Sequence, residues 1–249
     1  MPAPSPVTLI QLSDCHWSAD PNALYRGENP DRNLARLLPA CRAFRPDALV
    51  LSGDLAEDAS EAAYQRLADT LDGLAPQIGW LPGNHDDRRV MQPVFDNKGF
   101  SAGPIMTLGG WQLVLLDSTE PDRPDGEVNE ERLAPLSQLD NAKPALAFIH
   151  HQPVPVNAPW IDKYRLVNPE VFWQAIDPAV VRGVGFGHVH QAFVGEYQGV
   201  RCLSAPSTVA NSQAETERFT PDPTGPKARW YRLHADGRWQ TGLISVGMN

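Results

Sequence analysis

The chain has 249 residues, of which 42% are hydrophobic and 20% are charged. These proportions are ordinary for a globular protein, and they exclude a largely disordered chain and a membrane-embedded one. The formal net charge of −9 disfavours a DNA or RNA polymer as partner, because affinity for such polymers comes largely from Lys and Arg contacts to phosphates.

Short apolar runs alternate with segments of helical period, which is the pattern of an α/β protein. Buried strands are predicted, in chain order, at residues 7–12, 48–51, 78–81, 111–116, 145–149 and 183–186. Weaker runs predict further strands at residues 200–203, 231–233 and 243–246.

Three helices are predicted between these strands. The first covers residues 31–44, and a capping box formed by Asp58 and Glu61 opens a second that ends near residue 74. Asn168, which precedes a proline, predicts the start of a third. No internal repeat or linker divides the sequence, so we expect a single domain over residues 1–249. The expected fold class is α/β, with two β-sheets packed as a sandwich and flanked by helices.

Five of the predicted strands end in side chains that can bind metal ions, in segments 13–16, 52–54, 83–86, 150–151 and 187–190. Sites in open α/β sheets lie beyond the carboxyl ends of the strands, so we expect these segments to converge. Six of the seven histidines belong to them, and His234 lies outside, in an expected weak edge strand. Gly53, Gly83 and Gly187 each adjoin a candidate ligand, where a sharp turn or a close backbone approach is needed.

The types of side chain indicate the kind of metal. Imidazoles, carboxylates and one amide carbonyl suit Mn²⁺, Fe, Co²⁺ or Zn²⁺ better than they suit a Cys₄ zinc or an all-oxygen Ca²⁺ site. Two divalent ions that share Asp54, at the separation of roughly 3.5–4 Å usual in paired-metal hydrolases, would use all the candidates. Seven ligands at these strand ends exceed what one tetrahedral ion would use.

These ordered motifs resemble those of the calcineurin-like metallophosphoesterases. Segments 81–86, 150–155, 159–162, 187–191 and 205–208 are further similar to the bacterial class III 3′,5′-cyclic AMP phosphodiesterases, and the resemblance runs from Val7 to about Gly242. Cys15 stands where the family usually has a hydroxyl residue, and Gln152 replaces a proline or histidine. Neither departure removes a ligand.

The resemblance implies a role for each matching residue. One ion would be held by Asp14, His16, Asp54 and His190, and the other by Asp54, Asn84, His150 and His188. His85, oriented by Asp86, would lie over the scissile phosphate and protonate the departing oxygen, which makes Asp54 and His85 the expected catalytic residues. The residues expected to contact the substrate are His16, Asn84, His85, His190, Trp160, Ser207 and Thr208.

The implied reaction is hydrolysis of 3′,5′-cyclic AMP to 5′-AMP by a metal-bridging hydroxide. One alternative is a phosphodiesterase for other small diesters, such as other cyclic nucleotides or glycerophosphodiesters. Another is a catalytically inactive scaffold with the same fold. A nuclease for long DNA is disfavoured by the acidic charge.

Four assignments stay open at this point. His151 could replace His150 as a ligand, because neighbours on a strand point to opposite faces and only one of them is expected to face the ions. His85 could be a simple turn residue, and Trp160 could be a packing anchor instead of a stacking surface for the purine. Cys15 could be a thiolate in the site or an inert residue that faces away from its neighbours.

Cysteine usage and the absence of apolar segments bear on location. Cys15, Cys41 and Cys202 are far apart and lack CxxC spacing, so no disulfide framework is expected. The sequence has no leader-like start and no apolar run near the ~20 residues that a spanning helix needs. We therefore expect a cytoplasmic protein that acts on a small molecule and has no membrane partner.

Overall fold

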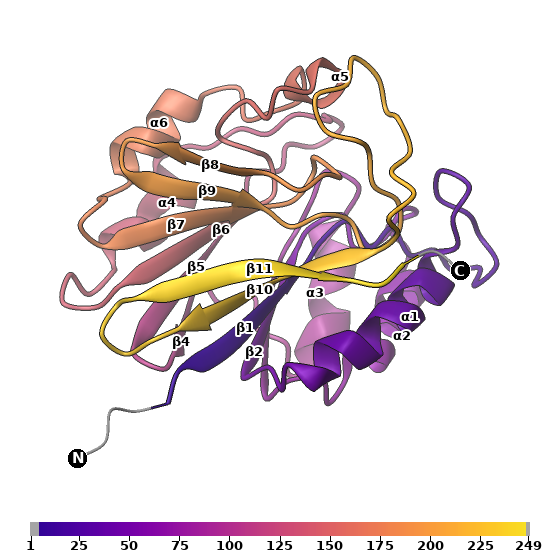
Figure 1. The fold of residues 1–249 in the computed structure, drawn as a ribbon, viewed down its shortest axis with the longest axis horizontal. Helices are drawn as coiled ribbons and strands as arrows, with labels where there is room; N and C mark the ends of the chain where they lie inside the picture. The colour runs from indigo at the N-terminus through magenta and orange to yellow at the C-terminus, as the bar shows by residue number, and fades with distance from the viewer. Residues whose placement is uncertain (1–4, 248–249) are drawn as a thin grey trace.

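Two mixed β-sheets pack face to face in the computed structural model, which describes residues 5–247 (Figure 1). Each sheet contains a set of neighbouring parallel strands, and the carboxyl ends of these strands lie at a common edge of that sheet. In spatial order the first sheet contains β11 (Trp239–Ser245), β10 (Lys227–Leu233), β1 (Val7–Leu12), β2 (Ala48–Ser52) and β3 (Gln77–Leu81). The second contains β4 (Ile105–Leu108), β5 (Trp111–Leu116), β6 (Ala145–Ile149), β7 (Val181–Phe186), β9 (Val200–Ser204) and β8 (Val194–Tyr197).

Helices cover the outer face of each sheet (Figure 1). The first sheet is covered by α1 (Pro30–Ala43), α2 (Glu61–Leu71) and α3 (Arg88–Asn97). The second is covered by α4 (Glu130–Ser137), α5 (Pro159–Asp162) and α6 (Pro169–Ala175). The expected fold class, a two-sheet sandwich flanked by helices, is confirmed. The single domain over residues 1–249 stays a prediction, and residues 1–4 and 248–249 lie outside the described part.

The strands are apolar on both faces because both faces are buried. In β1, Leu9 packs between the sheets, whereas Ile10 packs against the helices. Gln11 is polar and fully buried. Its Nε2 donates to the carbonyl of Phe186 at 3.2 Å, and its Oε1 accepts from the hydroxyl of Tyr231 at 2.6 Å. A one-residue slip of β1 would leave these groups unpaired, so Gln11 helps to fix the register of the two sheets.

The predicted strands are all present, and the sequence misses several shorter elements. β10 and β11 begin four residues earlier than expected, at Lys227 and Trp239. The missed β4 and β8 are edge strands of four residues each. The missed α3 and α4 contain Pro93 and Pro135, which obscure the helical pattern. His234 lies in the turn between β10 and β11 and not in an edge strand.

α2 begins with a different cap from the predicted one. Ser60, not Asp58, is the N-cap, and its hydroxyl accepts a backbone N–H of the first turn at 3.2 Å. Asp58 instead accepts from the backbone N–H and the hydroxyl of Ser60. The helix ends at Leu71, earlier than expected, because Gly73 follows with a left-handed φ of 69°.

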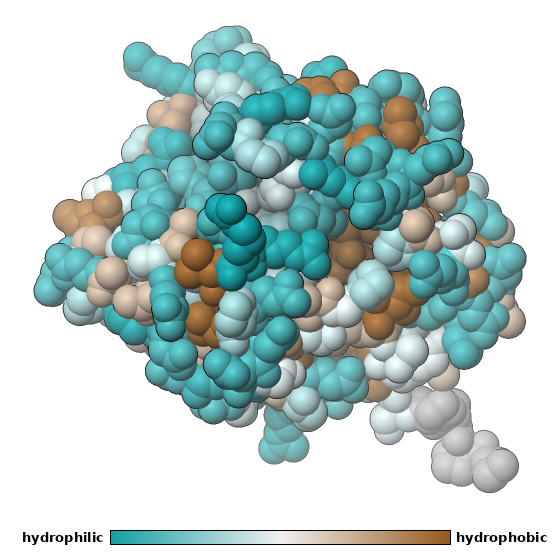
Figure 2. All heavy atoms as spheres, turned by 180° about the vertical axis from the view of Figure 1, so that it is seen from behind, coloured by the Kyte–Doolittle hydropathy of each residue, from teal (hydrophilic) through white to brown (hydrophobic). Residues whose placement is uncertain are grey.

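The face seen in Figure 2 is mostly hydrophilic, with hydrophobic residues scattered in small groups. Such scattered groups are normal on a globular protein and mark no binding face by themselves. Within residues 5–247, the helices are all too short or too polar to cross a membrane.

Candidate metal centre

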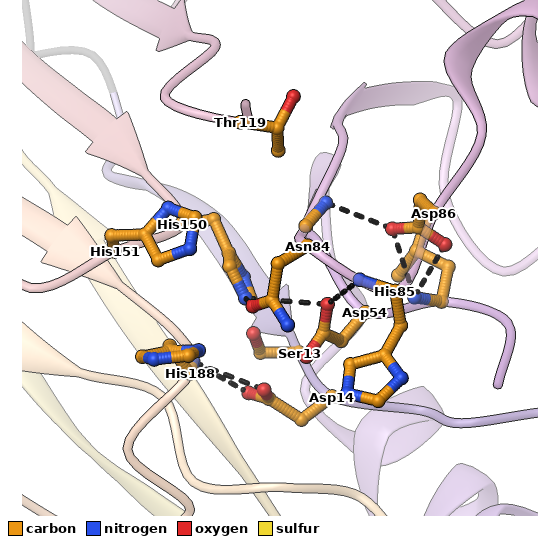
Figure 3. A network of polar contacts seen from close by, with 12 residues as sticks. Ser13, Asp14, Asp54, Asn84, His85, Asp86, Thr119, His150, His151 and His188 are labelled. Atoms are coloured by element: carbon orange, nitrogen blue, oxygen red, sulfur yellow. Dashed lines mark hydrogen bonds and ion pairs between the residues drawn. The ribbon is translucent and has the colours of Figure 1, made fainter. Parts of the chain in front are cut away.

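The carboxyl ends of β1, β2, β3, β6 and β7 bring the seven predicted ligands to one place. Figure 3 shows five of them: Asp14, Asp54, Asn84, His150 and His188. The Nε2 atoms of His16 and His190, 174 positions apart in sequence, are 3.2 Å apart. The first group of ligands, with one donor atom of each within 4.8 Å of the others, contains Asp14, His16, Asp54 and His190. The second group, beside Asp54, contains Asn84, His150 and His188.

The backbone is left-handed at five of these ligands. The φ angles are 52° at Asp14, 46° at His16, 51° at Asp54, 66° at His188 and 49° at His190. This conformation costs an L-residue roughly 1–2 kcal/mol, and it persists only where the surrounding structure enforces it. Its concentration at these strand ends is typical of a functional site.

Gly53 allows β2 to end close to His150. A Cβ at Gly53 would lie 2.5 Å from His150 Nδ1 and 2.7 Å from the backbone N of Gly83. Gly53 also has a φ of 86°. Only glycine satisfies both demands, so the glycine before Asp54 is required by a close approach as well as by a turn.

Three of the histidines have one ring nitrogen fixed by a hydrogen bond outside the site. Nδ1 of His150 donates to the carbonyl of Ser52 at 2.8 Å, and Nδ1 of His190 donates to the carbonyl of Ala210 at 2.8 Å. Nδ1 of His16 donates to Glu57 Oε2 at 2.7 Å. In its neutral form each ring therefore presents the lone pair of Nε2 to the centre, which is the tautomer that a metal ion requires.

In the first group, acceptor atoms face one another. His190 Nε2 lies 3.3 Å from Asp14 Oδ1, and His16 Nε2 lies 3.8 Å from Asp54 Oδ2. Lone pairs at these distances repel unless a cation or a proton lies between them. The group therefore fits a divalent cation.

The second group has the same character. His150 Nε2 lies 3.4 Å from Asp54 Oδ1 and 3.3 Å from Asn84 Oδ1. Among the described residues, Nε2 of His188 is buried without a hydrogen-bond partner. A buried imidazole nitrogen without a partner costs free energy unless a ligand satisfies it, so this group fits a second cation. Asp54 faces both groups.

The pKa values indicate which side chains of the centre are charged when no metal ion is bound. Burial disfavours the charged form of Asp54, but His150, His85 and His16 hold the pKa of its carboxyl well below its usual range. Burial likewise opposes protonation of His150, but the charge of Asp54 raises the pKa of His150 to about 9. Burial and the neighbouring His150 lower the pKa of His188 to about 3. His188 is thus neutral near pH 7, which is the form of the imidazole that binds a metal ion.

His150 and His151 do not point to opposite sides, as a continuing strand would require. β6 ends at Ile149, and the centroids of the two rings lie 4.9 Å apart. Nδ1 of His151 hydrogen-bonds with the hydroxyl of Ser118 at 2.8 Å, and its Nε2 is buried without a partner in the described structure. Its donor atoms also lie near those of His150 and His188. The choice of His150 as ligand stays a prediction, supported by its contacts with Asp54 and Asn84.

Glu57 was missed by the sequence reasoning. Its Oε2 lies 3.1 Å from Nδ1 of His85, in addition to its contact with His16. The expected orientation of His85 by Asp86 is wrong. The Asp86 carboxylate accepts from the backbone N–H groups of residues 55, 56 and 83 and from the hydroxyl of Tyr64, so it fixes loops behind the site. Glu57 follows the candidate ligand Asp54 by three residues, and this closeness in sequence could have indicated that Glu57 lies at the site.

A cavity of about 410 Å³ opens beside both groups, and His85 and Trp160 line it. Tyr25, also missed, lines the cavity and stacks on His16 with ring centroids 3.7 Å apart and planes at 6°. Trp160 packs edge-on against Phe219 at 5.4 Å. Trp160 is therefore both a packing residue and a cavity wall.

Ser207 and Thr208 are not brought to this cavity. Both side chains are fully buried. The hydroxyl of Ser207 donates to the carbonyl of Asp14 at 2.8 Å and accepts from the backbone N–H of Val209 at 3.0 Å. The structure places this pair beneath the ligands, where it supports the β1 end, and gives the expected substrate contact no support.

Cys15 points into the core behind the ligands. Burial raises the pKa of its thiol to about 12. The thiol is thus protonated near neutral pH, which favours the inert residue over the thiolate.

Comparison with known proteins agrees with this geometry. Residues 7–192 match the family described as calcineurin-like phosphoesterase. The chain belongs to that family. Among the relatives of this phosphoesterase, a 3′,5′-cyclic adenosine monophosphate phosphodiesterase CpdA of Pseudomonas aeruginosa is 33% identical over 246 residues, covering 96% of this chain and 90% of the relative. A 3′,5′-cyclic-nucleotide phosphodiesterase of Nostoc sp. is 31% identical, covering 97% and 93%.

Solved structures show the same fold at lower sequence identity. A dimetal phosphatase from Danio rerio has a TM-score of 0.65 at 16% identity and covers 97% of this phosphoesterase and 99% of that chain. A phosphopantetheinyl hydrolase from Mycobacterium tuberculosis has a TM-score of 0.58 at 18% identity, covering 82% and 91%.

Proposed function

We propose that the protein hydrolyses 3′,5′-cyclic AMP to 5′-AMP. The observation that carries the proposal is the convergence of bare imidazole nitrogens and two carboxylates beside a cavity of about 410 Å³. Cavities of roughly 300–1,000 Å³ are usual for small-molecule ligands. Two relatives that align with nearly the whole chain are named as cyclic nucleotide phosphodiesterases, one of them for cyclic AMP.

Two divalent cations complete the proposed site. We assign Asp14, His16, Asp54 and His190 to one, and Asp54, Asn84, His150 and His188 to the other. When bound, such ions activate water as a nucleophile and neutralise charge on phosphoryl oxygens. The mixture of nitrogen and oxygen ligands favours Fe, Mn, Zn or Co.

His85 supplies a proton to the leaving group, and Glu57 orients the imidazole of His85. In the proposed reaction, a water oxygen bonds to phosphorus and loses a proton to the solvent, and the bond from phosphorus to the 3′ oxygen breaks. The 3′ oxygen takes a proton from His85, whose Nδ1 is held by Glu57 and whose Nε2 is left for the substrate. Burial opposes protonation of His85, but Glu57 and Asp54 raise the pKa of its imidazole to about 9. His85 therefore carries the proton that the departing oxygen needs.

A product assay tests the proposal. Protein supplied with Mn²⁺ or Fe²⁺ should convert cyclic AMP into 5′-AMP, with no 3′-AMP, and a chelator should stop the reaction. Parallel rates on bis(p-nitrophenyl) phosphate and glycerophosphocholine show whether the nucleoside matters. A cyclic AMP rate no higher than the rates on these simple diesters would refute cyclic AMP as substrate.

Other 3′,5′-cyclic nucleotides are the second candidate substrates, because the Nostoc relative is named for cyclic nucleotides in general. Assays with cyclic GMP, CMP and UMP separate this reading from a cyclic AMP enzyme. We also propose a cytoplasmic location, which three buried free cysteines support.

A further inference from the structure

A two-residue turn presents Arg26 at the mouth of the cavity. Tyr25 and Glu28 exchange backbone hydrogen bonds of 2.8 and 2.9 Å, and the central residues Arg26 and Gly27 have φ angles of 50° and 87°. Turns of this type favour Asn or Gly at the first central position. An arginine in this conformation costs free energy, and backbone strain of this kind clusters at functional sites.

Two segments distant in sequence, together with the neighbouring Tyr25, surround the guanidinium of Arg26. Its Cζ lies 4.1 Å from the ring centroid of Phe219, in the loop between β9 and β10, and 5.7 Å from the ring of Trp160 in α5. Figure 1 shows this loop passing beside α5. Its Nε donates to the hydroxyl of Tyr25 at 3.1 Å. Aromatic contacts and one hydrogen bond thus orient the guanidinium plane.

The two Nη atoms of Arg26 have no fixed partner in the part of the chain that the structure describes. Among residues 5–247, no carboxylate forms an ion pair with Arg26 and no acceptor hydrogen-bonds with its two Nη atoms. Arg26 lines the same cavity as His85 and His190. Tyr25, which stacks on the candidate ligand His16, joins the turn to the metal centre. A substrate with its phosphate at the ligands would extend its other half towards Arg26.

We propose that Arg26 is a specificity-determining residue whose Nη edge donates hydrogen bonds to acceptor atoms of the nucleoside half of the substrate. This inference rests on the proposed function. Phe219 covers one face of the guanidinium, so recognition uses the edge of the plane. Purine ring nitrogens and ribose oxygens are acceptors of the kind that a guanidinium edge binds.

Paired substrates test the inference. Arg26→Ala is assayed with cyclic AMP and with methyl 4-nitrophenyl phosphate, a diester without a nucleoside. For cyclic AMP, kcat/KM should fall about 10- to 100-fold, the loss expected for a charge-assisted hydrogen bond, and mainly through KM. For the simple diester it should not change. Arg45→Ala is the matched control, because Arg45 is an exposed arginine with a similar φ of 49° at the end of α1. It should leave both substrates unaffected.

The outcomes separate the inference from the function on which it rests. Equal losses on both substrates, or no loss on either, would show that Arg26 only packs the turn against Phe219. Arg26→Lys keeps the charge but lacks the planar fork, so full activity of this variant on cyclic AMP would also overturn the proposal. If the wild-type protein hydrolyses the simple diester but not cyclic AMP, the proposed function itself fails, and this inference fails with it.

Discussion

Glu57 Oε2 lies 3.1 Å from Nδ1 of His85, so a carboxylate from the loop after β2 orients the candidate general acid. The same oxygen is 2.7 Å from Nδ1 of His16. Burial alone would raise the pKa of Glu57, but hydrogen bonds from His16 and His85 lower it to about 2. Glu57 is therefore ionised near neutral pH and couples a candidate ligand to the proton donor.

Glu57→Gln should lower kcat on cyclic AMP by about 10- to 100-fold, because a charge-assisted hydrogen bond to His85 is weakened. Loss of the negative charge also lowers the pKa of His85. Since the proton donor acts below its pKa, activity should fall at a lower pH than in the wild type as the pH rises. A pH–rate profile measures both effects. Glu61→Gln, on the exposed start of α2, is the control, and a profile unchanged in Glu57→Gln would contradict the prediction.

Asp54→Ala and His85→Ala should separate metal binding from proton transfer. Asp54 faces both groups of ligands, so its removal should abolish activity and release both ions. His85→Ala should keep the metals and lose roughly 10²–10⁴ in rate. Elemental analysis of the two purified variants, together with kcat, is the measurement. Metal loss from His85→Ala as complete as that from Asp54→Ala would show that the division of roles is wrong.

Metal affinity should weaken as the pH falls. In the metal-free protein the pKa of His150 is raised to about 9, so near pH 7 its imidazole is protonated and must lose a proton before it can bind a metal. Below that pKa, each competing proton lowers the apparent affinity about tenfold per pH unit. Calorimetric titration with Zn²⁺ at pH 7, in buffers of different ionisation enthalpy, should show proton release. Fewer protons should be released when His150→Ala binds Zn²⁺. If the wild-type protein bound Zn²⁺ without releasing a proton, competition between the proton and the metal at His150 would be excluded.

Gly53→Ala should remove metal binding through a steric clash. Its Cβ would lie 2.5 Å from His150 Nδ1, and the residue has a φ of 86°. Gly73→Ala is the matched control, because Gly73 has a φ of 69° but open space around a Cβ. Both variants incur the cost of a left-handed alanine, about 1–2 kcal/mol. Metal content and thermal denaturation should show a loss of stability in both and a loss of metal only in Gly53→Ala. Equal metal content in the two variants would mean that the close approach is unimportant.

Elements with strong local patterns were predicted well. The strands around the site, such as β1 and β6, were predicted with the bounds that the structure has, because buried parallel strands are continuous apolar runs. The edge strands β4 and β8 were missed because each has only four residues, and the missed helices α3 and α4 contain Pro93 and Pro135. The cap of α2 was misplaced by two residues because Asp58 and Ser60 are both good cap residues.

The sequence by itself determined which side chains follow the strand ends, because the order of residues and the apolar runs that form strands are both local properties. Only the tertiary structure decided which groups act between elements. Glu57 replaced Asp86 as the partner of His85, and Ser207 went beneath the site instead of into it. Contacts of this kind depend on how loops from different strands pack, and no periodicity along the chain records that packing.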